Sequence, residues 1–141
     1  MSLIYWDTML WIYQFEDHDV FGPRVAEMWE KVAARKDRLC LSTQGAAEVL
    51  TGPRRDENWD LYSRYLELFR SPELHLLDFS LTTAEVYADI RSRYKIAPAD
   101  AVHLACAAEA RVDLFLTHDR RLTGKFIPGI QFIASLDTEI L

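Results

Sequence analysis

The chain has 141 residues, half of them hydrophobic and 27% charged, with a formal net charge of −6. This length suits one compact unit with a sizeable core, so we expect residues 1–141 to form a single domain. The acidic balance is unlike that of a non-specific DNA-binding protein. The sequence has no apolar run near the roughly 18–20 residues that span a bilayer, and no secretory signal pattern. Because Cys40 and Cys106 lack the spacing of metal ligands, we expect buried free thiols and a cytoplasmic location.

Short apolar runs alternate with helical patterns along the chain. In chain order, the patterns predict a strand at 3–6, helices at 8–15 and 22–36, a strand at 38–42, helices at 43–51 and 58–70, a strand at 74–79, helices at 82–94 and 98–110, a strand within 113–119 and a last strand at 130–135. The helix at 43–51 is expected to end at Gly52-Pro53. Five strands separated by helices predict an α/β fold with a central, mainly parallel sheet.

Four carboxylates lie close to the ends of these elements. In a parallel α/β fold, ligands bind outside the carboxyl ends of the strands. Asp7 directly follows the first strand, Glu48 lies within two turns of the end of the second, and Asp119 closes the fourth. Asp100 begins the helix at 98–110. Connectivity alone leaves open which edge of the sheet Asp100 lies on, because two consecutive helices separate the third strand from the fourth.

Each of these acids also has a purely structural interpretation. Asp7 and Asp119 could be N-caps, Asp100 suits the dipole of a first helical turn, and Glu48 could be exposed. If the four converge, their mutual repulsion raises their pKa values unless a cation intervenes. Carboxylate oxygens suit Mg²⁺ or Mn²⁺, which can stabilise an in-line displacement at phosphorus.

Four segments together resemble the conserved blocks of PIN-domain ribonucleases, especially the VapC-type toxins of toxin–antitoxin pairs. In order, these segments read YWDTMLWIY, STQGAAEVLTG, IAPADAVHLACAAEA and LFLTHDRRL. The resemblance spans residue 4 to about residue 135. It implies a three-layer α/β/α fold with a central five-stranded sheet, and metal-dependent endoribonuclease activity on single-stranded or loop RNA, with tRNA or rRNA as the expected substrate class. It also implies an antitoxin partner and a homodimer.

The resemblance also assigns roles to individual residues. Asp7, Glu48, Asp100 and Asp119 match the acidic quartet that holds Mg²⁺ or Mn²⁺ in the family, and Thr117 matches a hydroxyl two positions before the last acid. A water molecule activated by the metal would leave products with a 5′-phosphate and a 3′-hydroxyl. The chain departs from the family at position 9, where Met replaces the usual Asn or Ser and cannot donate a hydrogen bond.

Other side chains are weaker candidates for a functional role. His103 and His118 lie near two of the acids, although a structural role is expected for each. Trp11 and Tyr13 could stack on bases. The helix at 58–70 could present an apolar face to an antitoxin or to a second protomer, or its large side chains could fill the chain's own core. A phosphate-binding rim could come from basic residues whose alternative is ordinary surface charge: Arg54, Arg55, Arg120, Arg121 and Lys125.

The sequence therefore supports three hypotheses. The first is a metal-dependent endoribonuclease that acts as a toxin. The second is a PIN-like fold kept for binding without catalysis, for which Met9 is the only sign. The third is a receiver-like phospho-acceptor domain, which needs paired acids after its first strand, whereas this chain has Asp7 alone there.

Overall fold

The structure is a computed structural model, and it describes residues 2–136. Within this range the chain forms five strands, six α-helices and one short 3-10 turn. In order, these are β1 (Leu3–Trp6), α1 (Thr8–Phe15), α2 (Gly22–Arg35), β2 (Arg38–Ser42), α3 (Thr43–Arg55), α4 (Trp59–Arg70), β3 (Leu74–Leu77), α5 (Leu81–Arg93), α6 (Pro98–Glu109), β4 (Leu114–Thr117), η1 (Arg120–Leu122) and β5 (Phe132–Ser135). The alternation predicted from the sequence is confirmed.

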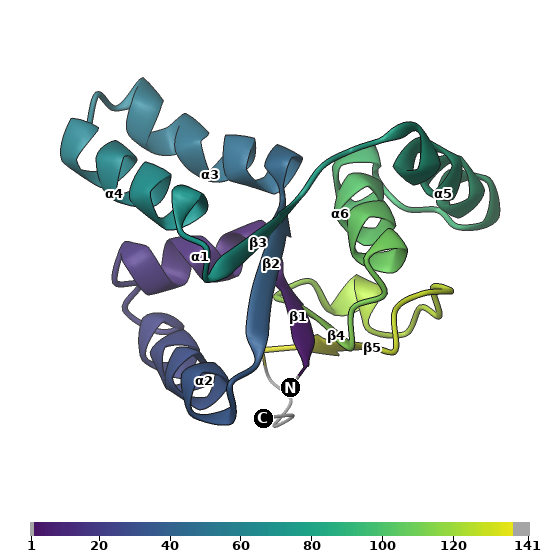
Figure 1. Ribbon diagram of the computed structural model, residues 1–141, viewed down its shortest axis with the longest axis horizontal. Helices are drawn as coiled ribbons and strands as arrows, with labels where there is room; N and C mark the ends of the chain where they lie inside the picture. The colour runs from purple at the N-terminus through teal and green to yellow at the C-terminus, as the bar shows by residue number, and fades with distance from the viewer. Residues whose placement is uncertain (1, 137–141) are drawn as a thin grey trace.

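The five strands form one sheet in the order β3-β2-β1-β4-β5. All four neighbouring pairs are parallel. Helices α1–α4 lie on one side of the sheet, and α5 and α6 lie on the other (Figure 1). Because both faces are covered, the central strands are apolar throughout: Ile4, Tyr5 and Trp6 of β1 have no exposed surface. The predicted three-layer α/β/α architecture is therefore confirmed.

An aromatic cluster joins β1 to the helices that cover one face of the sheet. The ring of Trp6 lies 5.1 Å from that of Trp11 on α1 and 5.8 Å from that of Trp29 on α2, measured between centroids. The indole nitrogen of Trp11 donates a hydrogen bond to the backbone carbonyl of Trp6 over 3.1 Å. This packing fixes the first turn of α1 against the end of β1, where Asp7 lies.

Helix α3 continues past the predicted stop at Gly52-Pro53 and ends at Arg55. A proline inside a helix lacks the N–H for one hydrogen bond and clashes with the preceding residue. Gly52 has no Cβ, which relieves part of that clash, and Pro53 is buried. The backbone then closes the helix by hydrogen bonds from Asp56 N to the Gly52 carbonyl and from Asn58 N to the Pro53 carbonyl.

Two predicted strands are shorter than expected. β3 ends at Leu77 rather than residue 79, because the chain turns toward Ser80, which caps α5 by accepting a hydrogen bond from Thr83 N. β5 begins at Phe132 rather than residue 130, because the preceding turn ends with a hydrogen bond from Ile130 N to the Ile127 carbonyl. In both cases the backbone next to the strand forms a local turn instead of continuing the sheet.

Cys40 and Cys106 are buried free thiols, as predicted. Burial raises the pKa of Cys40 to about 12 and that of Cys106 to about 11. None of the helices found between residues 2 and 136 has the length and apolar character needed to cross a membrane.

The loop that leads into β5 requires glycine at position 129. Gly129 has a φ of +100°, and a Cβ there would lie 2.4 Å from the carbonyl oxygen of Ala108 on α6. We expect Gly129→Ala to lower the free energy of unfolding by about 2 kcal/mol or more, because backbone strain and a steric clash add. Gly124→Ala is the matched control, with nothing within 4 Å of its Cβ. Urea unfolding measures both, and equal stabilities of the two variants would contradict the assignment.

Candidate functional site

The strand order reverses beside β1, whose neighbours are β2 and β4. Ligands bind parallel sheets at such a point, outside the carboxyl ends of the strands. Asp7 follows β1 directly, and its backbone N–H still bonds the carbonyl of Leu116 on β4 over 2.9 Å. Asp119 follows β4 by two residues. The pairing of β1 with β4 therefore brings together two acids that are far apart in sequence.

Thr117 links these two acids. Its buried hydroxyl donates to Oδ2 of Asp7 over 2.8 Å and accepts from the backbone N–H of Asp119 over 3.0 Å. The other carboxylate oxygen of Asp7, Oδ1, accepts from Thr8 N over 2.7 Å, so Asp7 is also the N-cap of α1. The structure thus places the Thr117 hydroxyl between Asp7 and the backbone of Asp119, and Asp7 is at the same time the N-cap of α1.

Glu48 reaches the same region from the interior of α3. Its Oε2 accepts a hydrogen bond from the Thr8 hydroxyl over 2.9 Å and lies 3.3 Å from Nε2 of His103. The hydrogen bond with His103 is the main cause of a lowered pKa for Glu48, because it favours the charged carboxylate. The side chain of Glu48 is 32% exposed and is held by Thr8 and His103, so its interpretation as an ordinary exposed side chain is wrong.

Asp100 lies on the same edge as the other acids. Helix α6 feeds the parallel strand β4 through a short loop, so its N-terminal turn is at the carboxyl edge of the sheet. Burial raises the pKa of Asp100, and the negative charges of Asp7 and Asp119 raise it further. His103, one turn after Asp100 on α6, lies 3.9 Å from Asp7 Oδ1 and 3.3 Å from Glu48 Oε2, so the first turns of α6 lie beside these acids.

Asp119 is held by Arg121. The guanidinium donates to both carboxylate oxygens, with distances of 3.0 Å and 3.3 Å from Nε and 2.8 Å from Nη2. This contact lowers the pKa of the Asp119 carboxyl. Asp119 also accepts from Arg121 N and caps η1, as its structural interpretation predicted. Arg121, one of the residues suggested for a phosphate-binding rim, is thus already paired with a carboxylate.

Two further expectations concern aromatic and imidazole side chains. Trp11 has no exposed surface, so its suggested role in base stacking is wrong. Tyr13 is almost fully buried, and its hydroxyl lies 2.7 Å from Nδ1 of His118. His103 is also buried, but in a polar network rather than in plain hydrophobic packing. Burial lowers its pKa, while the hydrogen bond with Glu48 and the surrounding carboxylates outweigh burial and raise the pKa overall.

The donor set suits a hard divalent cation in its chemistry. Four carboxylates lie toward one edge of the sheet, and carboxylate oxygens are ligands that hard divalent cations prefer. Within residues 2–136, however, no three His, Cys, Asp or Glu side chains are close enough together to form a ready metal cluster. The carboxylate of Asp119 is also paired with Arg121.

Comparison with known proteins gives a consistent result. The family model described as the PIN domain matches residues 4–125. No curated protein matches the chain. Solved structures share the fold. VapBC2 from Rickettsia felis, bound to a DNA fragment from its promoter, has a TM-score of 0.75 and 17% identity, and the match covers 94% of this chain and 98% of that chain.

Two other solved structures give similar matches. DNA-bound VapBC from Salmonella typhimurium has a TM-score of 0.66 and 20% identity, and the match covers 96% of this chain and 99% of that chain. VapC20 from Mycobacterium tuberculosis, described as a sarcin-ricin loop cleaving toxin, has a TM-score of 0.66 and 15% identity, and the match covers 79% of this chain and 86% of that chain. At these identities, the likeness establishes a shared fold.

The convergence of the acids can be measured directly. We expect Asp7→Asn and Asp119→Asn each to lower the pKa of Asp100, because each removes a negative charge that raises it. A ¹³C NMR titration of the Asp100 carboxyl in metal-free buffer gives this value. Asp60→Asn, in the first turn of α4, is the control and should leave it unchanged. An Asp100 pKa that responds to none of these substitutions would place Asp100 apart from the other acids.

Proposed function

Because the chain belongs to the PIN-domain family, we propose that it is a divalent-metal-dependent endoribonuclease and the toxin of a toxin–antitoxin pair. The observation that carries this proposal is geometric: the Thr117 hydroxyl bonds both Asp7 and the backbone of Asp119, and Nε2 of His103 lies 3.3 Å from Glu48 Oε2 and 3.9 Å from Asp7 Oδ1. We further propose that the whole chain acts as one domain in the cytoplasm, as a homodimer, on RNA of the tRNA or rRNA class.

The proposed metal ligands are Asp7, Glu48, Asp100 and Asp119, which would hold Mg²⁺ or Mn²⁺. When bound, the cation supplies positive charge that stabilises an in-line attack of water on the phosphodiester. The residues around the acids fix their orientation. Thr117 bonds Oδ2 of Asp7, the backbone N–H of Thr8 bonds Oδ1, and the Thr8 hydroxyl bonds Oε2 of Glu48. We propose that the Thr8 hydroxyl supplies the hydrogen bond that the neighbouring Met9, whose side chain is partly exposed, cannot donate.

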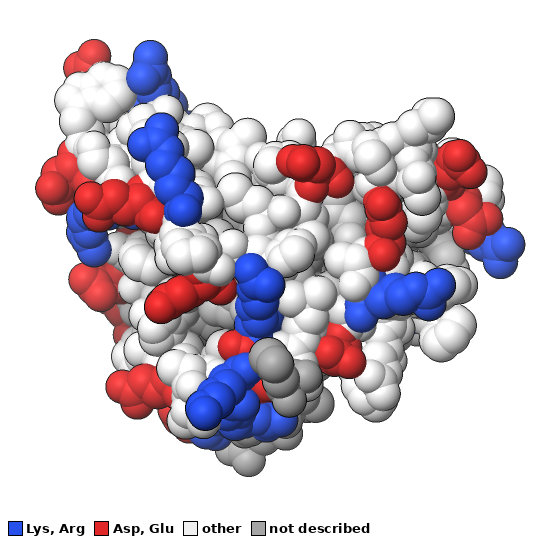
Figure 2. All heavy atoms as spheres, in the orientation of Figure 1, with Lys and Arg blue, Asp and Glu red and all other residues white. Residues whose placement is uncertain are grey.

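Arg121 is suited to contact the RNA backbone. Its side chain is 86% exposed and already bonds an anionic group, Asp119, in a bidentate manner. A guanidinium matches phosphate in the same geometry. Elsewhere, basic side chains are interspersed with acidic ones over the face shown in Figure 2. We therefore propose that local contacts near the acids, rather than a broad basic surface, hold the RNA.

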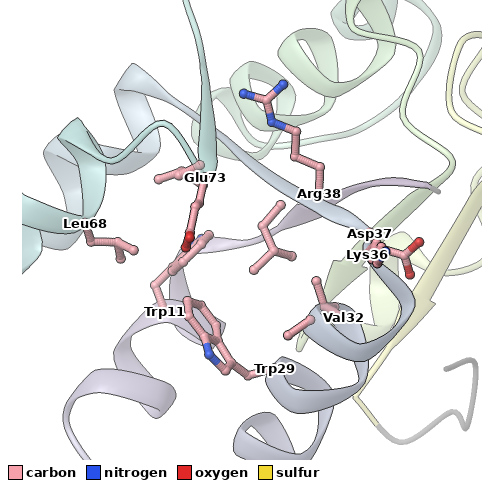
Figure 3. A pocket seen from close by; sticks show the side chains of 11 residues that line it. Trp11, Trp29, Val32, Lys36, Asp37, Arg38, Leu68 and Glu73 are labelled. Atoms are coloured by element: carbon pink, nitrogen blue, oxygen red, sulfur yellow. The ribbon is translucent and has the colours of Figure 1, made fainter.

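A groove on the α1–α4 side is the proposed antitoxin site. It has a volume of about 450 Å³, and its lining includes Trp29 and Val32 of α2 and Leu68 of α4. Figure 3 shows these side chains around the groove, with Arg38 and Glu73 beside them. An apolar floor with charges of both signs at the rim suits an amphipathic segment of a partner. One solved structure with this fold is a toxin–antitoxin complex from Klebsiella pneumoniae, which supports an antitoxin as the occupant.

The two alternative functions, a receiver-like domain and a non-catalytic PIN fold, differ in how well they agree with the structure. In receiver-like folds of the order 2-1-3-4-5, β1 lies next to β3, whereas here its neighbours are β2 and β4. The receiver-like hypothesis is therefore set aside. A non-catalytic PIN fold is favoured by one observation, the pairing of Asp119 with Arg121, which competes with a metal ligand role. Titration with Mn²⁺ separates this alternative from a nuclease.

The nuclease proposal predicts cleavage that depends on both the metal and Asp7. With Mn²⁺, the purified chain should cut a panel of tRNA and rRNA fragments and leave 5′-phosphate and 3′-hydroxyl ends, which RNA-end sequencing identifies. We expect Asp7→Asn to lower the cleavage rate at least ~100-fold. The variant lacks a carboxylate ligand for the cation, and the cation stabilises the negative charge of the transition state by several kcal/mol. Asp60→Asn should cleave like the wild type. A wild-type chain that neither cleaves RNA nor binds Mn²⁺ in calorimetry would refute the proposal.

The groove proposal predicts a selective loss of partner binding. Leu68→Arg puts a charge into the apolar floor, so we expect at least ~10-fold weaker binding of the small protein encoded by the neighbouring reading frame. Cleavage by the free chain should be unchanged. Glu67→Arg introduces the same side chain at an exposed position of α4 outside the groove and should bind normally. Equal binding by both variants, or no complex with the wild type, would contradict this site.

A further inference from the structure

His103 lies on α6, one turn after Asp100, and only 2% of its surface is exposed. Buried polar groups need hydrogen-bond partners. The two ring nitrogens of His103 find them on different elements: Nδ1 faces Tyr5 on β1, while Nε2 faces Glu48 on α3 and Thr8 on α1. A single imidazole therefore connects the central strand with two helices that bear candidate site residues.

The Nδ1 side of the ring is anchored by a chain of hydrogen bonds. Nδ1 lies 2.5 Å from the Tyr5 hydroxyl, which accepts from Ser42 N over 3.1 Å and bonds the Ser42 hydroxyl over 2.9 Å. Ser42 in turn caps α3 by accepting from Gly45 N over 2.9 Å. The Tyr5 ring stacks on Phe115 of β4 with centroids 5.0 Å apart. The anchor is thus buried in the centre of the sheet.

The ring also has little room to rotate. A Cβ on Gly45 would lie 3.0 Å from Cε1 of His103 and 2.5 Å from Cδ1 of Leu41. Helix α3 therefore needs glycine at position 45 to pack this closely on the imidazole. The Tyr5 ring also meets the imidazole edge-on, with centroids 5.7 Å apart. These close contacts and the hydrogen bond at Nδ1 restrict rotation of the ring and so fix the direction of Nε2.

That direction is toward the acids. Nε2 lies 3.3 Å from Oε2 of Glu48 and 3.9 Å from Oδ1 of Asp7. A carboxylate can only accept hydrogen bonds, and the Thr8 hydroxyl already donates its proton to Glu48. Nε2 must therefore be a donor in this arrangement, whichever way the protons of Tyr5 and Ser42 point.

We propose that His103 is a positioning residue: its Nε2–H holds Glu48 at the acidic site, and the Tyr5–Ser42 pair fixes the ring that does so. Its effect on activity rests on the proposed function, because it acts through Glu48 as a metal ligand. Groups that orient metal ligands in this way typically change metal affinity or activity by about 10–100-fold when they are removed.

Two isosteric substitutions separate positioning from packing. The amide nitrogen of Gln in His103→Gln reaches the place of Nε2 and can still donate to Glu48, whereas that of Asn in His103→Asn reaches only the place of Nδ1. We expect His103→Gln to keep its Mn²⁺ affinity and kcat within about 3-fold of the wild type. His103→Asn should lose about 10-fold or more in both, with little change in KM. If both variants lose stability equally and bind Mn²⁺ equally, His103 is a packing residue and the inference is wrong.

A measurement without RNA or metal keeps the inference separate from the proposed function. Long-range ¹H–¹⁵N NMR of the His103 ring should show a proton on Nε2, and Glu48→Gln should shift the Nε2 signal more than Glu67→Gln does. An unprotonated Nε2, or a signal that ignores Glu48, would overturn the inference even if the chain proves to be a nuclease. If the chain cleaves no RNA while this signal behaves as expected, the positioning stands and only the nuclease proposal fails.

Discussion

Repulsion between carboxylates at one edge of the sheet is the constraint around which this site is organised. The pairing of β1 with β4 fixes Asp7 next to Thr117 and Asp119, and the start of α6 adds Asp100. The fold holds this charge in place through donors built into it: Thr117 to Asp7, His103 to Glu48, and Arg121 to Asp119. Burial raises the pKa of Asp100, and the negative charges of Asp7 and Asp119 raise it further.

Much of the fold could be predicted from the sequence because its signals are local. The apolar runs that became β1 and β2 match their predicted bounds, since each is short and buried and a capping residue marks its end: Asp7 directly follows β1, and Ser42 is the last residue of β2. The acids that directly follow strands could be placed for the same reason, as parallel strands share a carboxyl edge. Thr117 came from family resemblance rather than from local pattern, and its hydroxyl indeed lies between Asp7 and Asp119.

What the sequence could not supply depends on tertiary contacts. The edge on which Asp100 lies required the course of α5 and α6 through space. The extension of α3 through Pro53 depends on burial of the proline, which overrides a local stop signal. Trp11 looked available for stacking, yet its ring is enclosed by Trp6 and Trp29. The role of His103 had one sequence signal, a glycine at position 45 of a helix, but its meaning depends on which side chain it faces.

The wide separation in sequence of β1 and β4 has a consequence for biosynthesis. The hydrogen bond between Asp7 and Thr117 joins residues 110 positions apart, so the first acid is made long before the strand that completes its surroundings. A nascent chain still lacking β4 has neither the central neighbour of β1 nor Asp119. An incomplete polypeptide that ends before β4 therefore cannot bring Asp7, Thr117 and Asp119 together.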